Sequence, residues 1–198
     1  MSETEKSPQG NGIGQTIREK KKLLRREMIQ RMRNLPESYV QEAGRRIQEQ
    51  VLSMPAFQNA GSVFVYVSIG REPPTGGILQ QALASGKSVY VPKCQGQGIM
   101  EAARIRSAED LKPGVLGIPE PVDWSETCGP EELDLMIVPC VCAGRDGKRL
   151  GHGAGYYDRF LAGHAEKAVC LCYARLLEES IPTEETDVRI PVILTEET

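Results

Sequence analysis

Residues 133–160 have the sequence LDLMIVPCVCAGRDGKRLGHGAGYYDRF, and this stretch decides the fold class. Residues 133–142 form an almost uninterrupted apolar run. This run predicts a strand covered on both faces, because a solvent-facing strand alternates apolar and polar residues. A polar turn and a glycine-rich loop follow, and a helix is expected over 156–163. A buried strand that leads through a loop into a helix is typical of α/β proteins.

The segments on either side continue this alternation. Apolar residues at helical spacing predict a helix over 16–35 and another that begins near Pro36 and runs to about 54. A third helix is expected from an N-cap at Thr75 through Ala84, with Gly86 ending it. Strands are expected at 62–69, 88–93, 99–106, 168–173 and 188–194, and mostly loop at 107–132. The expected fold is a three-layer α/β/α domain with a mostly parallel, mixed central sheet and N-terminal helices preceding the first strand.

Length and composition favour one globular domain. The chain has 198 residues, of which 40% are apolar and 26% charged. We expect a disordered tail over 1–15, which is polar and contains glycine, and a single domain over 16–198. No apolar run approaches the roughly 20 residues of a membrane span, and the N-terminus lacks the apolar core of a secretory signal. These features disfavour membrane, secreted and fibrous proteins, so we expect a cytoplasmic location and no membrane partner.

Six cysteines, none in a Cys-x-x-Cys pair, give no signature of a zinc ribbon or a thioredoxin-like redox site. Cys140 with Cys142, and Cys170 with Cys172, lie two apart in expected strands, so the sulfurs of each pair should share one face. We interpret all four as small buried hydrophobes in a reducing compartment. A four-thiolate metal site stays open only if the two strands are neighbours.

Charge is unevenly distributed, although the net charge is only −3. Residues 17–33 hold eight Lys and Arg against two acids, whereas acids dominate 120–134 and 178–197. Such a basic run occurs in nucleic-acid-binding proteins, but it is also typical of a solvated helix face balanced by acids elsewhere. No aromatic residues for base stacking lie within it, so we expect no nucleic-acid partner.

The glycine loop has features of a phosphate-binding site. Its glycines alternate along the chain: Gly151, Gly153 and Gly155. Glycines let backbone N–H groups approach a phosphate closely, and the N-terminus of a following helix favours anions. Arg149 offers a charge-assisted contact to phosphate, Asp158 offers a hard oxygen ligand for Mg²⁺, and two tyrosines offer a stacking surface.

The loop is not a P-loop, since no G-x-x-x-x-G-K-[ST] occurs. It is not the dinucleotide fingerprint either, because Tyr156 stands where G-x-G-x-x-G needs glycine. Spacing alone fits a structural turn as well as a ligand cradle. Two features favour the cradle: Lys21 and Arg25 share one face of the basic helix, and Glu72 is a lone acid in a Gly/Pro loop just beyond a strand.

Residues 133–161 resemble the signature of the 5-formyltetrahydrofolate cyclo-ligase family, also called 5,10-methenyltetrahydrofolate synthetases. Residues 21–25 (KKLLR) resemble the family's Lys-x-x-x-Arg helix, and 65–75 (VYVSIGREPPT) resemble its strand and loop with the substrate glutamate. Residues 181–187 with the later pair Thr195-Glu196 match its C-terminal Pro…Asp…Thr-Glu segment. Only 1–15 and 107–132 have no counterpart.

The resemblance implies an ATP- and Mg²⁺-dependent ligase that closes 5-formyltetrahydrofolate to 5,10-methenyltetrahydrofolate and releases ADP and phosphate. The reaction would pass through a phosphorylated formyl group, an iminium phosphate. By analogy, the ATP-binding residues are Lys21, Arg25, Arg149, Leu150, Gly151, His152, Gly153, Ala154, Gly155, Tyr156 and Tyr157. The folate-binding residues would be Val67, Glu72, His152, Gly153, Ala154, Gly155 and Tyr156. The metal ligands would be Asp158 and Asp187. No catalytic residue is assigned, and we expect a monomer whose partners are these small molecules.

Each of these residues also fits a purely structural role. Lys21 and Arg25 fit solvated charges on a helix. Tyr156 and Tyr157 fit aromatic rings that cap the core, and Asp158 fits a charge in the first turn of a helix. Asp187 fits a turn before a strand, and Glu72 fits an exposed loop acid.

Some positions depart from the family's pattern. Ala154 stands where the family often has Lys, and His152 stands where it often has Arg or Tyr, so a phosphate-facing cation is missing or replaced by a weaker, titratable one. Ala143 and Gly144 replace the usual Phe-Asp, which removes an aromatic wall. Two further functions therefore stay open: a non-catalytic or slow folate- or nucleotide-binding relative, and nucleic-acid binding through the basic helix.

Overall fold

The computed structural model describes residues 15–114 and 119–198. Its helices have these bounds: α1 Ile17–Arg33, α2 Glu37–Ser53, α3 Pro55–Asn59, α4 Gly76–Ala84 and α5 Tyr156–Phe160. None of the helices in these ranges combines the length and the apolar character that crossing a membrane requires. The tail predicted over 1–15 falls almost entirely outside the described residues.

Within the described residues, seven strands form one mixed sheet in the order β11-β10-β7-β1-β2-β3-β6. Their bounds are β1 Ser62–Val65, β2 Ser88–Gly96, β3 Ile99–Ile105, β6 Thr127–Cys128, β7 Leu135–Pro139, β10 Ala168–Leu171 and β11 Val192–Leu194. The strands from β11 to β2 run parallel, and β3 and β6 add antiparallel pairs. Two separate pairs are β4 (Leu111–Pro113) with β5 (Pro119–Pro121) and β8 (Cys142–Ala143) with β9 (Arg149–Leu150). The predicted mixed, mostly parallel sheet is confirmed.

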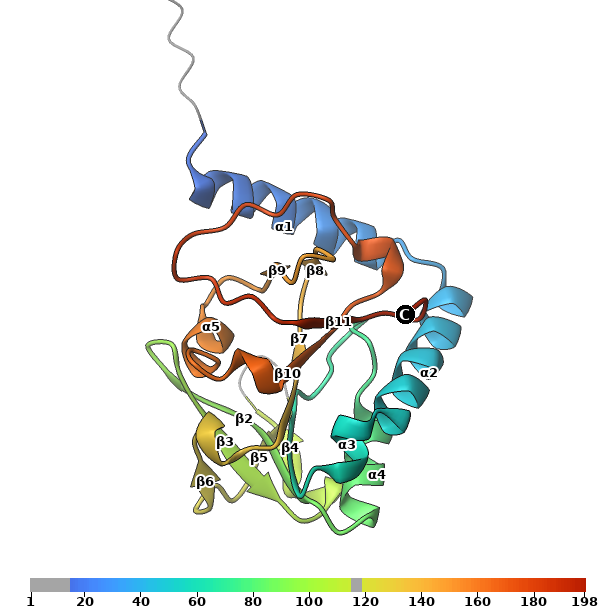
Figure 1. The fold of residues 1–198 in the computed structure, drawn as a ribbon, viewed down its shortest axis with the longest axis vertical. Coiled ribbons are helices and arrows are strands. Elements are labelled where there is room, and N and C mark those ends of the chain that lie inside the picture. The colour runs from blue at the N-terminus through green and yellow to red at the C-terminus, as the bar shows by residue number, and fades with distance from the viewer. Residues whose placement is uncertain (1–14, 115–118) are drawn as a thin grey trace, which may run out of the picture.

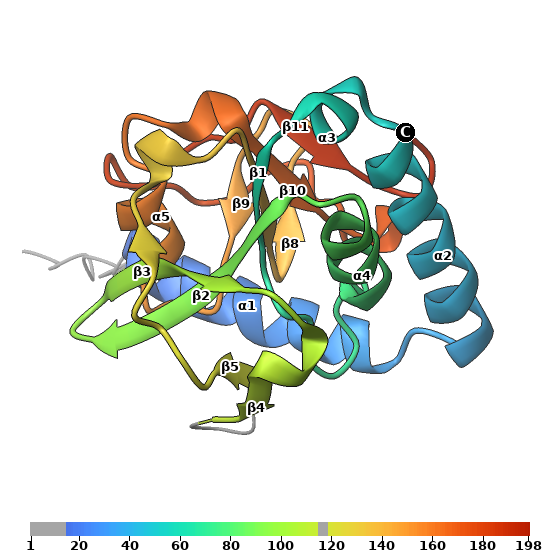
Figure 2. The ribbon, with the colours of Figure 1, turned by 90° about the horizontal axis from the view of Figure 1, so that it is seen from below.

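Helices cover both faces of this sheet, as Figures 1 and 2 show. Successive side chains of β1 point to opposite faces. Phe64 therefore contacts Phe160 of α5, with ring centroids 5.0 Å apart. On the other face, α4 packs on β1 and β2, and α2 packs on α4. Val63 and Val65 are fully buried on that side of β1. The predicted three-layer α/β/α arrangement is confirmed.

Helix α1 lies across one end of the sheet instead of on a face (Figure 1). A capping box begins it: Glu19 N donates to Thr16 Oγ1 at 3.2 Å, and Thr16 N donates to Glu19 Oε2 at 2.8 Å. Met28 and Met32 are buried beneath the helix. Its basic side then faces the end of the sheet to which β7 runs. In open α/β sheets, ligands bind at this carboxyl end of the strands.

The strand predicted over 62–69 ends after its first half, as β1. Beyond β1, backbone groups of residues 66–69 form hydrogen bonds with side chains of the following loop. Thr75 Oγ1 donates to Tyr66 O at 2.7 Å, and Ile69 N donates to Glu72 Oε2 at 2.9 Å. Thr75 occupies the N-cap position of α4 as predicted, but it makes no capping hydrogen bond because its hydroxyl is committed to this loop.

The strand predicted over 133–142 divides into two. β7 ends at Pro139, which has no N–H to continue the ladder. The chain then turns into β8, beside which Val141 N donates to Leu150 O at 2.7 Å. A hairpin of β8 and β9 therefore separates β7 from the glycine loop, which follows β9.

Other elements also differ from their predicted bounds. α5 ends at Phe160 instead of 163, because the following turns close with hydrogen bonds that span three residues. β11 begins at Val192 instead of 188, because Val188 N donates to Asp158 Oδ1 at 3.2 Å and not to the sheet. Residues 107–132, predicted as mostly loop, contain short strands.

The paired cysteines are buried free thiols, each at most 2% exposed: Cys140, Cys142, Cys170 and Cys172. Burial raises the pKa of the Cys142 thiol to about 12. Although β7 and β10 are neighbours, the described residues contain no group of three or more side chains placed to hold a metal ion. The predicted burial of these cysteines is confirmed, and the reducing compartment stays a prediction.

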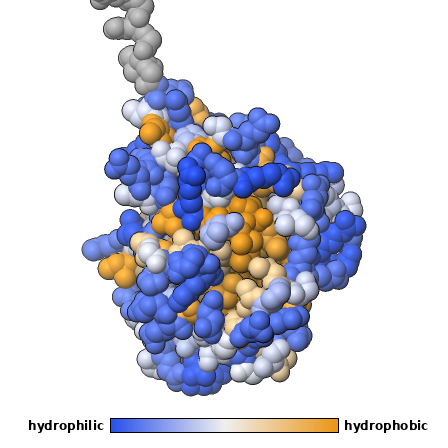
Figure 3. All heavy atoms as spheres, in the orientation of Figure 1, coloured by the Kyte–Doolittle hydropathy of each residue, from blue (hydrophilic) through white to orange (hydrophobic). Residues whose placement is uncertain are grey.

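Apolar surface gathers over the middle of the face drawn in Figure 3, where Figure 1 places β11 in front of β10. Val192, in the edge strand β11, is 36% exposed there. Hydrophilic side chains surround this area on the face drawn.

Candidate functional site

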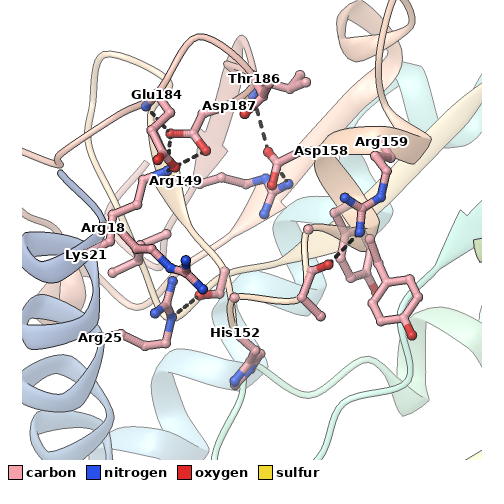
Figure 4. Close-up of a pocket in the computed structure, with 18 of the residues that line it drawn as sticks. Arg18, Lys21, Arg25, Arg149, His152, Asp158, Arg159, Glu184, Thr186 and Asp187 are labelled. Carbon is pink, nitrogen blue, oxygen red and sulfur yellow. Dashed lines mark hydrogen bonds and ion pairs between the residues drawn. The ribbon is translucent and has the colours of Figure 1, made fainter. Parts of the chain in front are cut away.

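A cavity of about 1490 Å³ opens beneath α1, where β7 ends at Pro139. Its walls come from α1, the glycine loop (residues 151–155), α5 and residues 184–188, and Figure 4 shows the charged side chains that converge on it. Pockets for one small ligand typically measure about 300–1,000 Å³. This cavity is larger, so it has room for a nucleotide and part of a second molecule.

Every residue that the sequence assigned to ATP, and both residues assigned to metal, line this single cavity. The residues come from α1, from β9 through α5 and from the segment before β11. These segments are far apart in sequence and are brought together by the fold. Val67 and Glu72 are not part of this lining; they follow β1 on the adjacent side of the glycine loop.

The backbone of the glycine loop is open to a ligand. Gly153 and Gly155 have φ of +104° and +71°, conformations that favour glycine. The N–H groups of residues 151–155 donate to no acceptor in the described part of the chain. Backbone donors without a protein partner must be satisfied by solvent or by a ligand. A concave row of such donors is a site for anions.

Three side chains hold this loop from different directions. Arg25 Nε donates to Gly151 O at 2.7 Å, and its guanidinium lies 3.2 Å from the position that a Cβ on Gly153 would take. His152 Nε2 lies 3.1 Å from Glu72 Oε1. Arg159 Nη2 donates to the carbonyl of Ala154 at 2.7 Å. The loop is thus shaped by side chains, because its own N–H groups make no backbone hydrogen bonds.

Lys21 forms ion pairs with two acids on the opposite wall of the cavity. Its Nζ donates to Asp187 Oδ1 at 2.7 Å and to Glu184 Oε2 at 2.8 Å, and the side chain is 11% exposed. Burial by itself would lower the pKa of Lys21, but the two carboxylates outweigh it and raise the pKa above its ordinary value. Lys21 therefore stays a cation at the edge of the cavity.

Arg149 is the deepest cation of the site, with a side chain only 2% exposed. Its Nη2 donates to Asp158 Oδ1 at 3.0 Å, and its guanidinium lies over the ring of Tyr157 at 5.7 Å. Its Nε is buried and has no hydrogen-bond partner among the described residues. A buried donor of this kind is costly unless a ligand or water completes it. An anion in the cavity would do so.

The carboxylates predicted to hold metal are each paired with a cation: Asp158 with Arg149, and Asp187 with Lys21. In the described residues no cluster of three metal-binding side chains would hold an ion unaided. Mg²⁺, however, is usually bound through one or two carboxylates, waters and substrate phosphates. Two carboxylates beside a phosphate-sized space fit that pattern.

Glu72 is a buried acid, and its interpretation as an exposed loop residue is wrong. Its side chain is 7% exposed, with one oxygen fixed by Ile69 N and the other beside His152. Tyr157 packs nearby, edge-on to Phe64. Burial raises the pKa of Tyr157, with smaller contributions from Glu72 and Cys94. Glu72 therefore sits in an enclosed region that touches the glycine loop.

Sequence reasoning missed two residues of this site. Glu184 pairs with Lys21 across 163 positions, and Arg159 contacts Gly98 across 61 positions. No local spacing signals such contacts. The only signal for Arg159 was its place directly after Asp158 in the quoted stretch.

Comparisons with known proteins agree with this geometry. The model of the 5-formyltetrahydrofolate cyclo-ligase family matches residues 17–196. A Caenorhabditis elegans protein named probable 5-formyltetrahydrofolate cyclo-ligase is 32% identical, over 91% of this chain and 94% of its own length. The 5-formyltetrahydrofolate cyclo-ligase of Escherichia coli K12 is 30% identical, over 84% and 94%.

Solved structures match as well. The 5,10-methenyltetrahydrofolate synthetase of Aquifex aeolicus gives a TM-score of 0.80 at 30% identity and covers 90% of both chains. The synthetase of Mycoplasma pneumoniae gives 0.72 at 18% identity, over 89% of this chain and 99% of that one, which supports the fold alone. Because the family model and these relatives span nearly the whole chain, the protein belongs to the 5-formyltetrahydrofolate cyclo-ligase family of enzymes, as the sequence predicted.

Proposed function

We propose that this protein closes 5-formyltetrahydrofolate to 5,10-methenyltetrahydrofolate and couples the closure to hydrolysis of ATP to ADP and phosphate. One observation carries the proposal: the glycine loop, with its unpaired N–H groups, lies between the cations of α1 and the buried Glu72. A nucleotide on the first side and a folate on the second would meet at this loop.

The nucleotide side is argued from charge. Lys21, Arg25 and Arg149 converge on the cavity, and Arg149 Nε lacks a partner in the described chain. Phosphate oxygens would accept from these cations and from the N–H groups of residues 151–155. The aromatic rings of Tyr156 and Tyr157 would border the nucleotide.

The folate side is argued from Glu72. A carboxylate that is almost buried can accept from the N–H donors of a pterin, and such charge-assisted bonds are stronger than neutral ones. Glu72 is held in place by Ile69 N and by His152, so it is oriented before the ligand arrives. Val67, half-buried beyond β1, lies on the same chain segment and would pack against the pterin.

The chemistry requires positioning more than covalent catalysis by the protein. A formamide oxygen is a poor leaving group, so it first attacks the γ-phosphorus of ATP, and ADP departs. The N10 nitrogen then attacks the activated formyl carbon of the iminium phosphate and loses its proton, the C–O bond breaks, and the phosphate leaves with that proton. Lys21, Arg25 and Arg149 would stabilise charge on the transferred phosphoryl group.

Mg²⁺ would be held by Asp158 and Asp187 and would neutralise the phosphate oxygens. Lys21 and Arg149, which pair with these carboxylates in the ligand-free chain, would then turn to the phosphates.

The direct test is to incubate the protein with 5-formyltetrahydrofolate, ATP and Mg²⁺ and to follow the near-ultraviolet absorbance of the methenyl product together with phosphate release. We expect one phosphate per product, and no product when ATP is omitted or Mg²⁺ is chelated. Tight folate binding without ATP-dependent product would identify a non-catalytic relative, the second function suggested by Ala154 and Ala143.

Nucleic-acid binding through α1 stays a second hypothesis. Lys21, Arg25 and Arg31 of this helix contact other parts of the protein, whereas its remaining basic residues, such as Arg18 and Lys22, are exposed. The cytoplasmic location and the monomeric state stay predictions.

A further inference from the structure

Arg159 joins the glycine loop to a hairpin that is distant in sequence. Its Nε donates to Gly98 O at 2.9 Å, and its Nη2 donates to Ala154 O at 2.7 Å. Gly98 lies in the turn between β2 and β3, and Ala154 lies in the glycine loop. Figure 4 shows the side chain of Arg159 extending from α5 to the loop carbonyl.

Two glycines make room for this contact. A Cβ on Gly98 would lie 1.6 Å from Arg159 Nη2, and a Cβ on Gly155 would lie 3.2 Å from Nη1. Both glycines have positive φ, +79° and +71°. The guanidinium therefore lies directly against backbone on both sides. Its planar fork of donors reaches two carbonyls at once, which the single ammonium of lysine does less well.

The glycine loop has few contacts at its C-terminal end. Arg25 fixes Gly151 and lies beside Gly153, and Glu72 contacts His152. Beyond them, Gly155 O accepts from Arg159 N at 3.2 Å where α5 begins, but no N–H of the loop bonds to the described chain. The side chain of Arg159 adds the contact at Ala154 that ties this end of the loop to another element.

We propose that Arg159 is a positioning residue that clamps the glycine loop to the β2–β3 hairpin, so that the loop's free N–H groups are ordered before phosphate binds. The proposal rests on the proposed role of this loop in holding ATP. Ordering a loop in advance removes a cost from binding. The clamp should therefore act on the affinity for ATP and on its KM, and much less on kcat.

Backbone ¹⁵N relaxation of the protein without ATP tests the clamp without any assumption about function. We expect Arg159→Ala to lower the order parameters of residues 151–155 and of the hairpin turn, with little change elsewhere. Arg159→Lys should have an intermediate effect. Arg46→Ala is the matched control, because Arg46 is exposed and pairs only with Glu42 on α2. Loop order parameters that are the same in Arg159→Ala and Arg46→Ala would overturn the proposal.

Calorimetric titration with ATP and Mg²⁺, together with steady-state kinetics, tests the consequence. We expect Arg159→Ala to raise the dissociation constant and the KM for ATP about ten-fold, with kcat within about two-fold of the unchanged enzyme. A merely structural role would lower the unfolding temperature and leave KM unchanged, and that result would also overturn the proposal.

Gly98→Ala provides a second route to the same clamp, because the added methyl group collides with the guanidinium. Its effect on ATP affinity should be clearly smaller when Arg159 is already alanine than in the natural protein. Additive effects in this cycle would contradict the clamp. If the natural protein neither binds ATP nor forms product while the relaxation result holds, the proposed function fails and the clamp stands.

Discussion

Replacing Gly153 by alanine tests whether the backbone of the glycine loop and Arg25 form one unit. The φ of Gly153, +104°, lies beyond the left-handed region that other residues occasionally adopt. The new Cβ would also lie 3.2 Å from Arg25 Cζ and 3.3 Å from Nη2. Both the backbone and the guanidinium must therefore move, and the 2.7 Å hydrogen bond from Arg25 Nε to Gly151 O is expected to break.

The magnitude follows from these two effects. Backbone strain at such a φ costs about 1–3 kcal/mol. A hydrogen bond from a charged donor contributes about 1.5–3 kcal/mol, and less here because Arg25 is only half-buried. We expect the free energy of unfolding to fall by roughly 2–4 kcal/mol. The affinity for ATP should fall at least about ten-fold, because a phosphate-binding cation and the loop N–H groups leave their places together.

Urea unfolding measures the stability, and calorimetric titration with ATP and Mg²⁺ measures the affinity. Gly86→Ala is the matched control, since Gly86 has φ of +74° but no atom within 4 Å of the added Cβ. It should lose only about 1–2 kcal/mol of stability and no affinity. Gly76→Ala, which has no positive φ and open space at the start of α4, should be neutral or stabilising. Equal losses of stability at Gly153 and Gly86, with unchanged ATP affinity, would refute the reasoning.

Three further predictions test other parts of the site and the core. Asp158→Asn keeps an oxygen that accepts from Arg149 and removes the charge offered to Mg²⁺, so kcat should fall about a hundred-fold. The unfolding midpoint should also fall, because the buried Arg149 loses its counter-charge; unchanged turnover would exclude Asp158 from the metal role. Glu72→Gln should raise the KM for 5-formyltetrahydrofolate about ten-fold and leave that for ATP unchanged, and parallel increases in both KM values would contradict the assignment. Burial raises the pKa of Cys142 from 9.0 to about 12. The unfolded chain therefore loses this proton at a lower pH than the folded chain. The contribution of this thiol to the free energy of unfolding should be constant below about pH 9 and fall above it. Urea unfolding from about pH 7 to 10.5 should show a weaker fall in Cys142→Ala, and an identical fall would contradict the role of this thiol.

The order of elements was predictable because it depends on local periodicity. The apolar runs that became β1, β7 and β10 exclude a solvent-facing strand wherever they lie in the fold. The ends of these strands were not predictable in the same way. β1 stops because Thr75 and Glu72, several positions later, take its hydrogen bonds, and 188–191 leave the sheet because Asp158 takes the N–H of Val188. Such competition depends on tertiary contacts that spacing does not encode.

The candidate site divides along the same line. The meeting of the glycine loop and the cations in one cavity was predictable, because alternate glycines and neighbouring cations are local features whose chemistry is general. Arg159 was not, since its significance comes from Gly98 on a distant hairpin. The pairing of Lys21 with Asp187 spans 166 positions. It was not predictable from the sequence that these two residues, expected to bind different ligands, form an ion pair with each other.

This pairing gives a physical reason why the residues proposed to bind phosphate and those proposed to bind metal lie in one cavity. Lys21 and Arg149 are largely withdrawn from water, and a buried charge without a partner costs several kcal/mol. Asp187 and Asp158 provide those partners while the cavity holds no ligand. If phosphates bound the cations without Mg²⁺, the carboxylates would lose their partners. If Mg²⁺ bound the carboxylates without phosphates, the cations would lose theirs. Both exchanges together leave every charge paired, so under the proposed function nucleotide and metal should bind cooperatively. The cooperativity would arise from the exchange of partners in the Lys21–Asp187 and Arg149–Asp158 ion pairs, without any movement of a domain.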